Sequence, residues 1–145
     1  MILKYIKSII TYEEFGRMMN QLVDHLKTVP NKFDYIYGPP KGAWPIITHL
    51  ANHLKIECLS SEGFCETLDK EIKNYLIADD IVDKGQTLGN IHGYEFENKY
   101  CPRPYYVSLF YKPQSTFKPD YYVKKIPNEI WVVFPWERYD EEPNR

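Results

Sequence analysis

The sequence has no excess of charge of either sign. Its 18 lysines and arginines stand against 20 aspartates and glutamates, which gives a formal net charge of −2. A broad surface for nucleic acid or for an anionic membrane needs a strong basic excess. We therefore expect neither a nucleic-acid partner nor a membrane partner.

Long hydrophobic runs are also missing. No apolar stretch approaches the roughly 20 residues of a membrane helix, and the first residues, MILKYIKSIITYEEF, lack the continuous apolar core of a signal peptide. Cysteine is scarce. The three cysteines, Cys58, Cys65 and Cys101, are odd in number and show no CxxC spacing. A reducing, cytoplasmic location is the simplest interpretation of that pattern.

Two common nucleotide-binding motifs are absent, because neither GxGxxG nor GxxxxGK[ST] occurs in the chain. Internal repeats and low-complexity segments are absent as well. What remains is 145 residues of ordinary globular composition, with 43% hydrophobic and 26% charged residues. This length predicts a single domain over residues 1–145.

Strand and helix patterns alternate along the middle of the chain. A helix is expected at 11–27, where Thr11 and Glu14 form a capping-box pattern, and another at 44–54, with Pro45 in its first turn. Further elements are short strands at 33–38, 56–60, 75–79, 105–111, 120–126 and 130–134, and a glycine-weakened helix at 87–98. This alternation predicts an α/β domain with a mostly parallel central sheet flanked by helices.

Two unusual loops follow strands of that sheet, GPPKGA at 38–43 and DDIVDKGQT at 79–87. Ligands of parallel α/β sheets bind at the carboxyl ends of the strands, where both loops fall. In the second loop the backbone N–H groups before a helix that starts at about Thr87 favour a phosphate. Gly85 permits a positive φ or a close approach by the ligand, and Lys84 and Thr87 would add donors.

Three carboxylates stand beside this phosphate site, at Asp79, Asp80 and Asp83. Acids there would repel a phosphate unless they bind something else. Two uses fit, namely hydrogen bonds from vicinal sugar hydroxyls and coordination of Mg²⁺. A phosphate at one end, with a diol and a metal at the other, describes ribose 5-phosphate. For a bare Asp-Asp pair, the alternative is a solvated turn that caps a helix.

The string LIADDIVDKGQTL at 76–88 resembles the 5-phosphoribosyl-1-pyrophosphate (PRPP) signature of the type I phosphoribosyltransferases. It matches that signature position by position except at Lys84, where threonine is usual. The segment around GPPKGA is similar to the family's pyrophosphate loop, with Lys41-Gly42-Ala43 where relatives often have Arg-Gly-Gly. In several relatives the peptide before the basic residue is cis, which directs attention to Pro40–Lys41.

The C-terminal part is similar to the bacterial xanthine-guanine phosphoribosyltransferases. YKP, DYYVKKIP and IWVVFPWE occur in the order in which those proteins carry their counterparts. The likeness spans roughly 34–137 and is closest to the purine members, the xanthine-guanine and hypoxanthine-guanine enzymes. It implies the type I phosphoribosyltransferase fold with a small hood formed by the terminal segments, and assembly as a homodimer or homotetramer.

The resemblance also implies a role for each matching residue. Asp83 would be catalytic, exchanging a proton with N7 of the base. The ribose and 5-phosphate of PRPP would be bound by Asp79, Asp80, Asp83, Lys84, Gly85, Gln86 and Thr87. The pyrophosphate would be bound by Lys41 and Gly42. The cofactor would be Mg²⁺, held by Asp80, with Glu137 reaching it only through water.

Three residues would bind the base. Lys112 would donate to a 6-oxo group, Trp131 would stack on the ring, and the backbone of Val132 would read the base edge. The ordinary alternatives are a solvated strand-end lysine for Lys112 and an indole of the core for Trp131. The segment SEGFCETLDKEIK at 61–73 shows no clear period, so we predict a mobile loop there. It stands where the family keeps a mobile lid, but it is shorter and lacks the Ser-Tyr pair of many relatives.

The function implied is transfer of the 5-phosphoribosyl group from PRPP to hypoxanthine, guanine or xanthine, in purine salvage. Three alternatives stay open. A phosphoribosyltransferase for another base is disfavoured by Lys112 and Trp131. A non-catalytic PRPP- or nucleotide-sensing regulator is disfavoured by Asp83, and a plain α/β interaction domain would not respond to PRPP. The sequence does not distinguish among the oxopurines.

Overall fold

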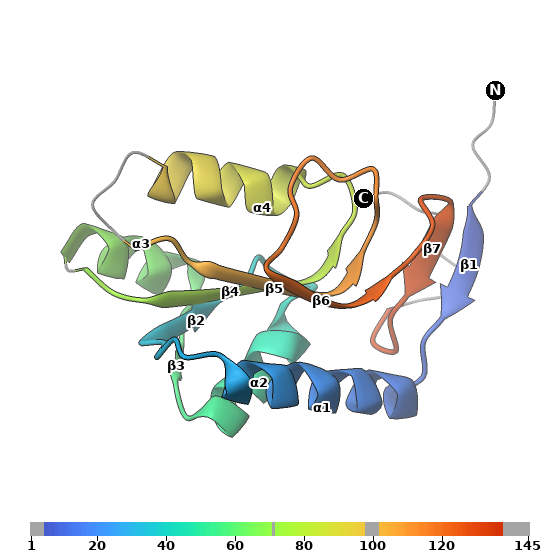
Figure 1. Ribbon diagram of the computed structural model, residues 1–145, viewed down its shortest axis with the longest axis horizontal. Helices are drawn as coiled ribbons and strands as arrows, with labels where there is room; N and C mark the ends of the chain where they lie inside the picture. Colours follow the sequence, from blue (N-terminus) through green and yellow to red (C-terminus); the bar gives the residue numbers. More distant parts are fainter. Residues whose placement is uncertain (1–4, 71, 98–101, 138–145) are drawn as a thin grey trace.

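The computed structural model describes residues 5–70, 72–97 and 102–137 (Figure 1). At its centre is a parallel sheet of five strands in the order β3-β2-β4-β5-β6. These strands are β2 (Tyr35–Tyr37), β3 (Glu57–Cys58), β4 (Tyr75–Val82), β5 (Tyr105–Tyr111) and β6 (Tyr121–Lys125). The predicted α/β domain with a parallel sheet is therefore confirmed.

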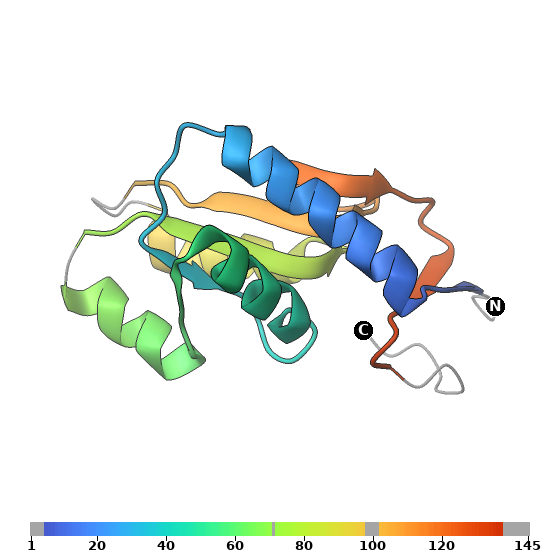
Figure 2. The ribbon, with the colours of Figure 1, turned by 90° about the horizontal axis from the view of Figure 1, so that it is seen from below.

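Helices cover both faces of the sheet. α1 (Tyr12–Thr28) and α2 (Trp44–Leu54) lie on one face, and α4 (Gln86–Ile91), continued by the π-helical turn η1 (His92–Phe96), lies on the other (Figures 1 and 2). α1 begins at the predicted cap, where Thr11 Oγ1 accepts a hydrogen bond from the Glu14 N–H at 3.1 Å. Its buried face is formed by Met19, Leu22, Val23 and Leu26.

β4 is the central strand, and all eight of its residues are buried. Leu76 and Ala78 belong to the core on the α1 and α2 side, while Ile77 and Val82 belong to the core on the other side. The strand extends three residues beyond its predicted end. The reason is that Ile81 and Val82 continue the ladder with Phe110 and Tyr111 of β5, so the two adjacent aspartates lie within a strand and not after it.

The two terminal segments form a separate small sheet. β1 (Ile6–Ile9) and β7 (Ile130–Val133) pair in parallel, with Ile6 opposite Ile130. The pair stands beyond the carboxyl ends of the central strands, at the right of Figure 1. The hood that the family resemblance implied is thus present. β1 was not predicted, because its IKSI run is short and both of its isoleucines are exposed.

The segment predicted as a mobile loop at 61–73 is instead a helix, α3 (Ser61–Lys70). Phe64 is 4% exposed and stacks on Tyr37 with 4.1 Å between ring centroids, and Leu68 packs one turn later. Ser60 Oγ accepts a hydrogen bond from the Gly63 N–H at 3.0 Å at the start of the helix. The prediction was wrong because two apolar residues four positions apart are too few to show a period in a polar segment.

Within the described parts of the chain, no helix combines the length and the apolar character that crossing a bilayer requires.

Candidate active site

The two unusual loops meet in one cavity of about 370 Å³ at the carboxyl ends of the central strands. Its wall is formed by Tyr5, Pro39, Pro40, Gly42, the continuous run 79–88 and Glu137. The run 79–88 contains every residue that the sequence assigned to the ribose and the 5-phosphate. The expected meeting of the loops at one edge of the sheet therefore occurs.

Asp79 and Asp80 lie at the floor of this cavity and are 8% and 7% exposed. Asp79 Oδ1 accepts a hydrogen bond from the Asp80 N–H at 2.8 Å, and Asp80 Oδ1 accepts one from the Ile81 N–H at 2.7 Å. These bonds to the strand's own backbone fix both carboxyl groups. They leave Asp80 Oδ2 directed toward the first loop, where a β-carbon on Gly42 would lie only 2.5 Å from it.

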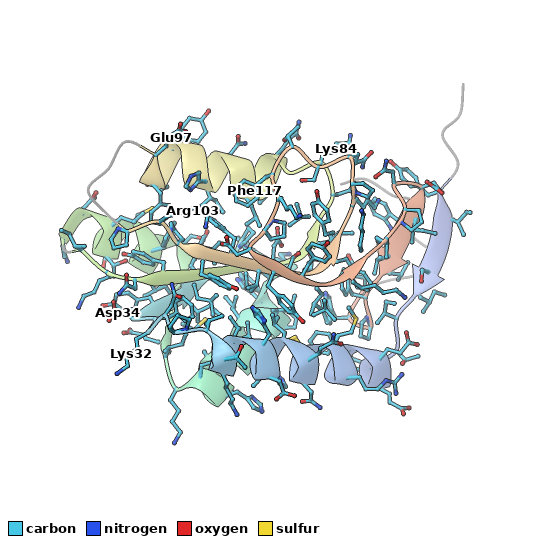
Figure 3. All side chains as sticks on the ribbon, viewed as in Figure 1. Lys32, Asp34, Lys84, Glu97, Arg103 and Phe117 are labelled. Carbon is cyan, nitrogen blue, oxygen red and sulfur yellow. The ribbon has the colours of Figure 1, made fainter. Side chains whose placement is uncertain are left out.

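The turn that follows β4 has the backbone conformation that was predicted from the sequence. Gly85 has a φ of +84°, in the left-handed region, and α4 begins at the next residue. The connection between β5 and β6 supports the turn, because the Thr116 N–H donates to the Lys84 carbonyl at 3.1 Å. A β-carbon on Gly85 would lie 2.6 Å from the Phe117 nitrogen. Lys84 and Phe117 are labelled in Figure 3, on the side of the sheet that α4 covers.

Asp83 forms an ion pair with Lys112, with 3.1 Å between Oδ2 and Nζ. The Lys112 side chain is fully buried, and the Asp83 side chain is 17% exposed. Gln114 Nε2 donates to the other oxygen of Asp83. The expected catalytic residue and the expected base-binding lysine are therefore in direct contact. Gln114 was not predicted, because nothing in its local sequence distinguishes it.

The three expected base-binding residues are close to the cavity but do not line it. Lys112, Trp131 and Val132 are 0%, 8% and 1% exposed. Tyr5 lines the cavity at this place, with its ring centroid 5.5 Å from that of Trp131 and 5.5 Å from Lys112 Nζ. Tyr5 was also missed from the sequence, because it is one of 13 tyrosines and precedes an unpredicted strand.

The expected pyrophosphate residues divide between two surfaces. Gly42 lines the cavity, while the exposed Lys41 lines a neighbouring groove together with Trp44, His49 and Trp136. The peptide between Pro40 and Lys41, to which the family resemblance directed attention, is cis. Glu137 lines the cavity, and its Oε1 accepts a hydrogen bond from the Phe134 N–H at 3.0 Å.

The chain is similar in sequence to curated xanthine-guanine phosphoribosyltransferases. It is 32% identical over 62 residues to the protein of Cereibacter sphaeroides and 31% identical over 65 residues to that of Gluconobacter oxydans. These matches take in 43% and 45% of this chain but only 34% and 35% of the two relatives. No family model matches the sequence.

Similarity to solved structures extends over nearly the whole chain. A purine phosphoribosyltransferase from Pyrococcus horikoshii superimposes with a TM-score of 0.78 and 25% identity, over 95% of this chain and 99% of that one. A xanthine-guanine-hypoxanthine phosphoribosyltransferase from Helicobacter pylori superimposes with a TM-score of 0.72 over 91% and 93% of the two chains; at 19% identity this second likeness concerns the fold alone. The comparisons confirm the resemblance that the sequence motifs indicated.

Proposed function

We propose that this chain, which has the type I phosphoribosyltransferase fold and is similar in sequence to xanthine-guanine members, transfers the 5-phosphoribosyl group of PRPP to a 6-oxopurine. The observation that carries the proposal is the single cavity in which Asp79, Asp80 and the 83–87 turn face Gly42 of the first loop. Hypoxanthine, guanine and xanthine are the candidate acceptors. The products are the nucleoside monophosphate and pyrophosphate.

We expect PRPP to occupy the cavity in one orientation. Its 5-phosphate would accept hydrogen bonds from the 84–87 turn, whose backbone is opened by Gly85. Its ribose hydroxyls would donate to the carboxylates of Asp79 and Asp80, which stand before that turn. The pyrophosphate would then lie against Gly42, whose lack of a side chain lets the first loop approach Asp80 closely, with Lys41 at the edge.

The donor set suits a Mg²⁺ ion that arrives with PRPP. Within the described residues, no group of three histidine, cysteine or acidic side chains could hold a metal by itself. Mg²⁺ commonly takes one or two protein carboxylates and completes its shell with substrate phosphates and water. Asp80 would hold the ion, and Glu137 would reach it through water. When bound, the ion neutralises charge on the departing pyrophosphate.

In the reaction, the bond between ribose C1 and pyrophosphate breaks and its electron pair leaves with the pyrophosphate. N9 of the purine forms the new bond to C1, and Asp83 would accept the proton from N7. Lys112 would donate to the 6-oxo group, which favours an oxopurine over adenine because the 6-amino group of adenine is itself a donor. The 3.1 Å contact between Asp83 and Lys112 supports this pairing, since N7 and the 6-oxo group share one edge of the base.

Base competition tests the proposal. Initial rates are measured with PRPP and Mg²⁺ for hypoxanthine, guanine, xanthine, adenine, orotate and uracil in turn, together with the melting temperature in PRPP or a nucleotide. Turnover confined to the three oxopurines is expected. Turnover with adenine or a pyrimidine would indicate a phosphoribosyltransferase for another base. No turnover with any base, but a raised melting temperature, would indicate a PRPP- or nucleotide-sensing regulator.

The same proposal includes assembly as a homodimer or homotetramer. Several large apolar side chains remain exposed on the single chain, among them Ile6 at 62%, Ile9 at 59% and Trp44 at 51%. Exposed apolar surface of this kind is often covered by a partner subunit. Sedimentation equilibrium gives the mass directly, and a monomer at micromolar concentration would contradict this part of the proposal.

A further inference from the structure

The residues that would read the base are covered by an aromatic ring. Lys112 and Trp131 are 0% and 8% exposed, so neither is open to a ligand in the cavity. The cavity wall at this place is Tyr5, which is 36% exposed and touches both of them. The base subsite of the proposed reaction is therefore closed while the phosphate and ribose part of the cavity is open.

Tyr5 makes the two contacts that a purine would make. Its ring packs at an angle of 60° against the indole of Trp131, at 5.5 Å between centroids. Its π face is 5.5 Å from the ammonium of Lys112, a distance at which a cation and an aromatic ring attract each other. A base that stacks on Trp131 and accepts a hydrogen bond from Lys112 needs the same space, so ring and base exclude each other.

The backbone allows the ring to leave. The ladder between β1 and β7 begins at Ile6, whose N–H donates to the Glu129 carbonyl at 2.9 Å, with Ile6 opposite Ile130. Tyr5 comes one residue before that ladder. Rotation of its side chain toward solvent therefore breaks no β1–β7 hydrogen bond, and the hood remains assembled while the subsite opens.

We propose that Tyr5 is a gate of the base subsite, which its ring fills when no base is present and leaves when a base binds. This inference rests on the proposed function for the identity of the ligand. Because only the open population binds, the apparent dissociation constant of the base equals its intrinsic value divided by the fraction of time that the gate is open. PRPP binding should not be affected in this way, since the ring packs on Trp131 and Lys112, whereas Asp79, Asp80 and the 84–87 turn would hold PRPP.

Three variants test the gate kinetically. Tyr5→Ala is expected to lower KM for the oxopurine roughly three- to thirtyfold, the range that one aromatic pair and one cation–π contact can account for, with KM for PRPP unchanged. Tyr5→Phe keeps the ring and should behave as the wild type. Tyr12→Ala, which removes a tyrosine that is 68% exposed on α1, is the matched control. An increased KM for the base in Tyr5→Ala would overturn the gate, because the ring would then be a wall on which the base stacks.

A second measurement does not depend on turnover. The chain has three tryptophans, so 5-fluorotryptophan labelling gives three ¹⁹F resonances, and Trp131→Phe identifies one of them. Without ligand, a soluble gadolinium chelate should relax the Trp131 resonance several-fold faster in Tyr5→Ala than in the wild type or Tyr5→Phe. Unchanged relaxation overturns the gate even if oxopurines turn over. Faster relaxation with no turnover of any base supports the gate and contradicts the proposed reaction.

Discussion

Gly42 belongs to the first loop and Asp80 to β4, yet there is no room between them for a methyl group. A β-carbon at Gly42 would lie 2.5 Å from Asp80 Oδ2 and 3.0 Å from its Cγ. Asp80 is 7% exposed and accepts a hydrogen bond from the Ile81 N–H, so its carboxyl group has little space into which it could move. This contact determines how far the site proposed for the ribose and the metal, at Asp80, lies from the site proposed for the pyrophosphate, at Gly42.

Gly42→Ala is therefore expected to displace the Asp80 carboxylate and to lower kcat/KM for PRPP by about 10- to 100-fold, since a displacement of about 1 Å can cost that much. Gly16→Ala is the matched control, because nothing lies within 4 Å of that position in α1. The control should gain about 0.5–1 kcal/mol of stability and keep its activity. Equal activity in both variants would contradict the placement of PRPP across this contact.

Asp83→Asn tests the proposed proton acceptor. An amide cannot take the N7 proton, so kcat should fall by about 10²- to 10⁴-fold, while Asp79, Asp80 and the 84–87 turn still bind PRPP. The substitution also removes the charge opposite the buried Lys112, which destabilises the fold, so rates are compared after folding has been verified by circular dichroism. Asp69→Asn, at an exposed position of α3, should behave as the wild type.

At the scale of the residue, the sequence predicted which residues share the cavity where these residues occupy consecutive positions. The acids and the turn of 79–87 share one cavity because one strand and one turn carry them all. Gln114 and Tyr5 could not be found in the same way. Gln114 meets Asp83 across 31 positions, and Tyr5 meets Trp131 through the pairing of the two terminal segments. Contacts of this length follow from topology and leave no local pattern.

Among the elements, α3 is held by an aromatic cluster. Phe64 stacks on Tyr37 and meets Tyr75 edge-to-face, with centroid distances of 4.1 Å and 5.4 Å. Phe64→Ala should lower the free energy of unfolding by about 3–5 kcal/mol, the usual cost of emptying a buried phenylalanine site. Urea denaturation measures it, with Glu66→Ala, at an exposed position of the same helix, as the control. A loss below about 1 kcal/mol would indicate that the segment is not docked and would restore the predicted mobile loop.

His25 joins α1 to the edge of the sheet. Its ring stacks on Tyr121 at 3.6 Å between centroids and shares a 2.8 Å hydrogen bond with the hydroxyl of Tyr105. Burial lowers the pKa of His25 from the ordinary value of 6.5. The native state thus favours the neutral ring. The stability contributed by this group is complete above pH 6.5 and is lost as the pH falls through the lowered pKa.

The difference in unfolding free energy between about pH 7.5 and about pH 5.5 should therefore be larger in the wild type than in His25→Phe, which keeps a stacking ring but has no proton to gain. His49, whose pKa is also lowered by burial, accounts for part of the dependence that remains in the variant. Equal differences in the two proteins would show that His25 titrates alike in the folded and unfolded states.

For the whole molecule, the alternation of strands and helices was enough to predict the parallel sheet, because a crossover between parallel strands usually contains a helix. The connection from β5 to β6, over 112–120, is a crossover without one. The hood was anticipated only from the family resemblance. In strand β1 of the hood, Ile6 and Ile9 are 62% and 59% exposed. The apolar residues of β1 therefore do not mark a buried face, and the strand could not be predicted from its hydrophobic pattern. The small sheet depends on the pairing of two segments that are far apart in the sequence. Local periodicity contains no information about such a pairing.

Binding at a single cavity should stabilise the whole domain. Because PRPP with Mg²⁺ would bind the native state and not the unfolded chain, a concentration 100 times Kd should add about 2.7 kcal/mol. For a domain of this size, that corresponds to an increase in Tm of roughly 5–10 °C. Differential scanning calorimetry measures the increase, and ribose 5-phosphate alone should give a smaller one. No increase at saturating PRPP would contradict the assignment of the cavity.

The most direct test of the central claim is the stoichiometry of the products. The purified chain is mixed with PRPP, Mg²⁺ and each of hypoxanthine, guanine and xanthine in separate reactions, and nucleoside monophosphate and pyrophosphate are quantified in the same samples over time. Equal amounts of both products, formed in proportion to enzyme and strongly reduced in Asp83→Asn, are the predicted result. Pyrophosphate without nucleotide would show that PRPP is bound and cleaved but that the ribosyl group is not transferred to the base. The absence of both products would contradict phosphoribosyl transfer at this site.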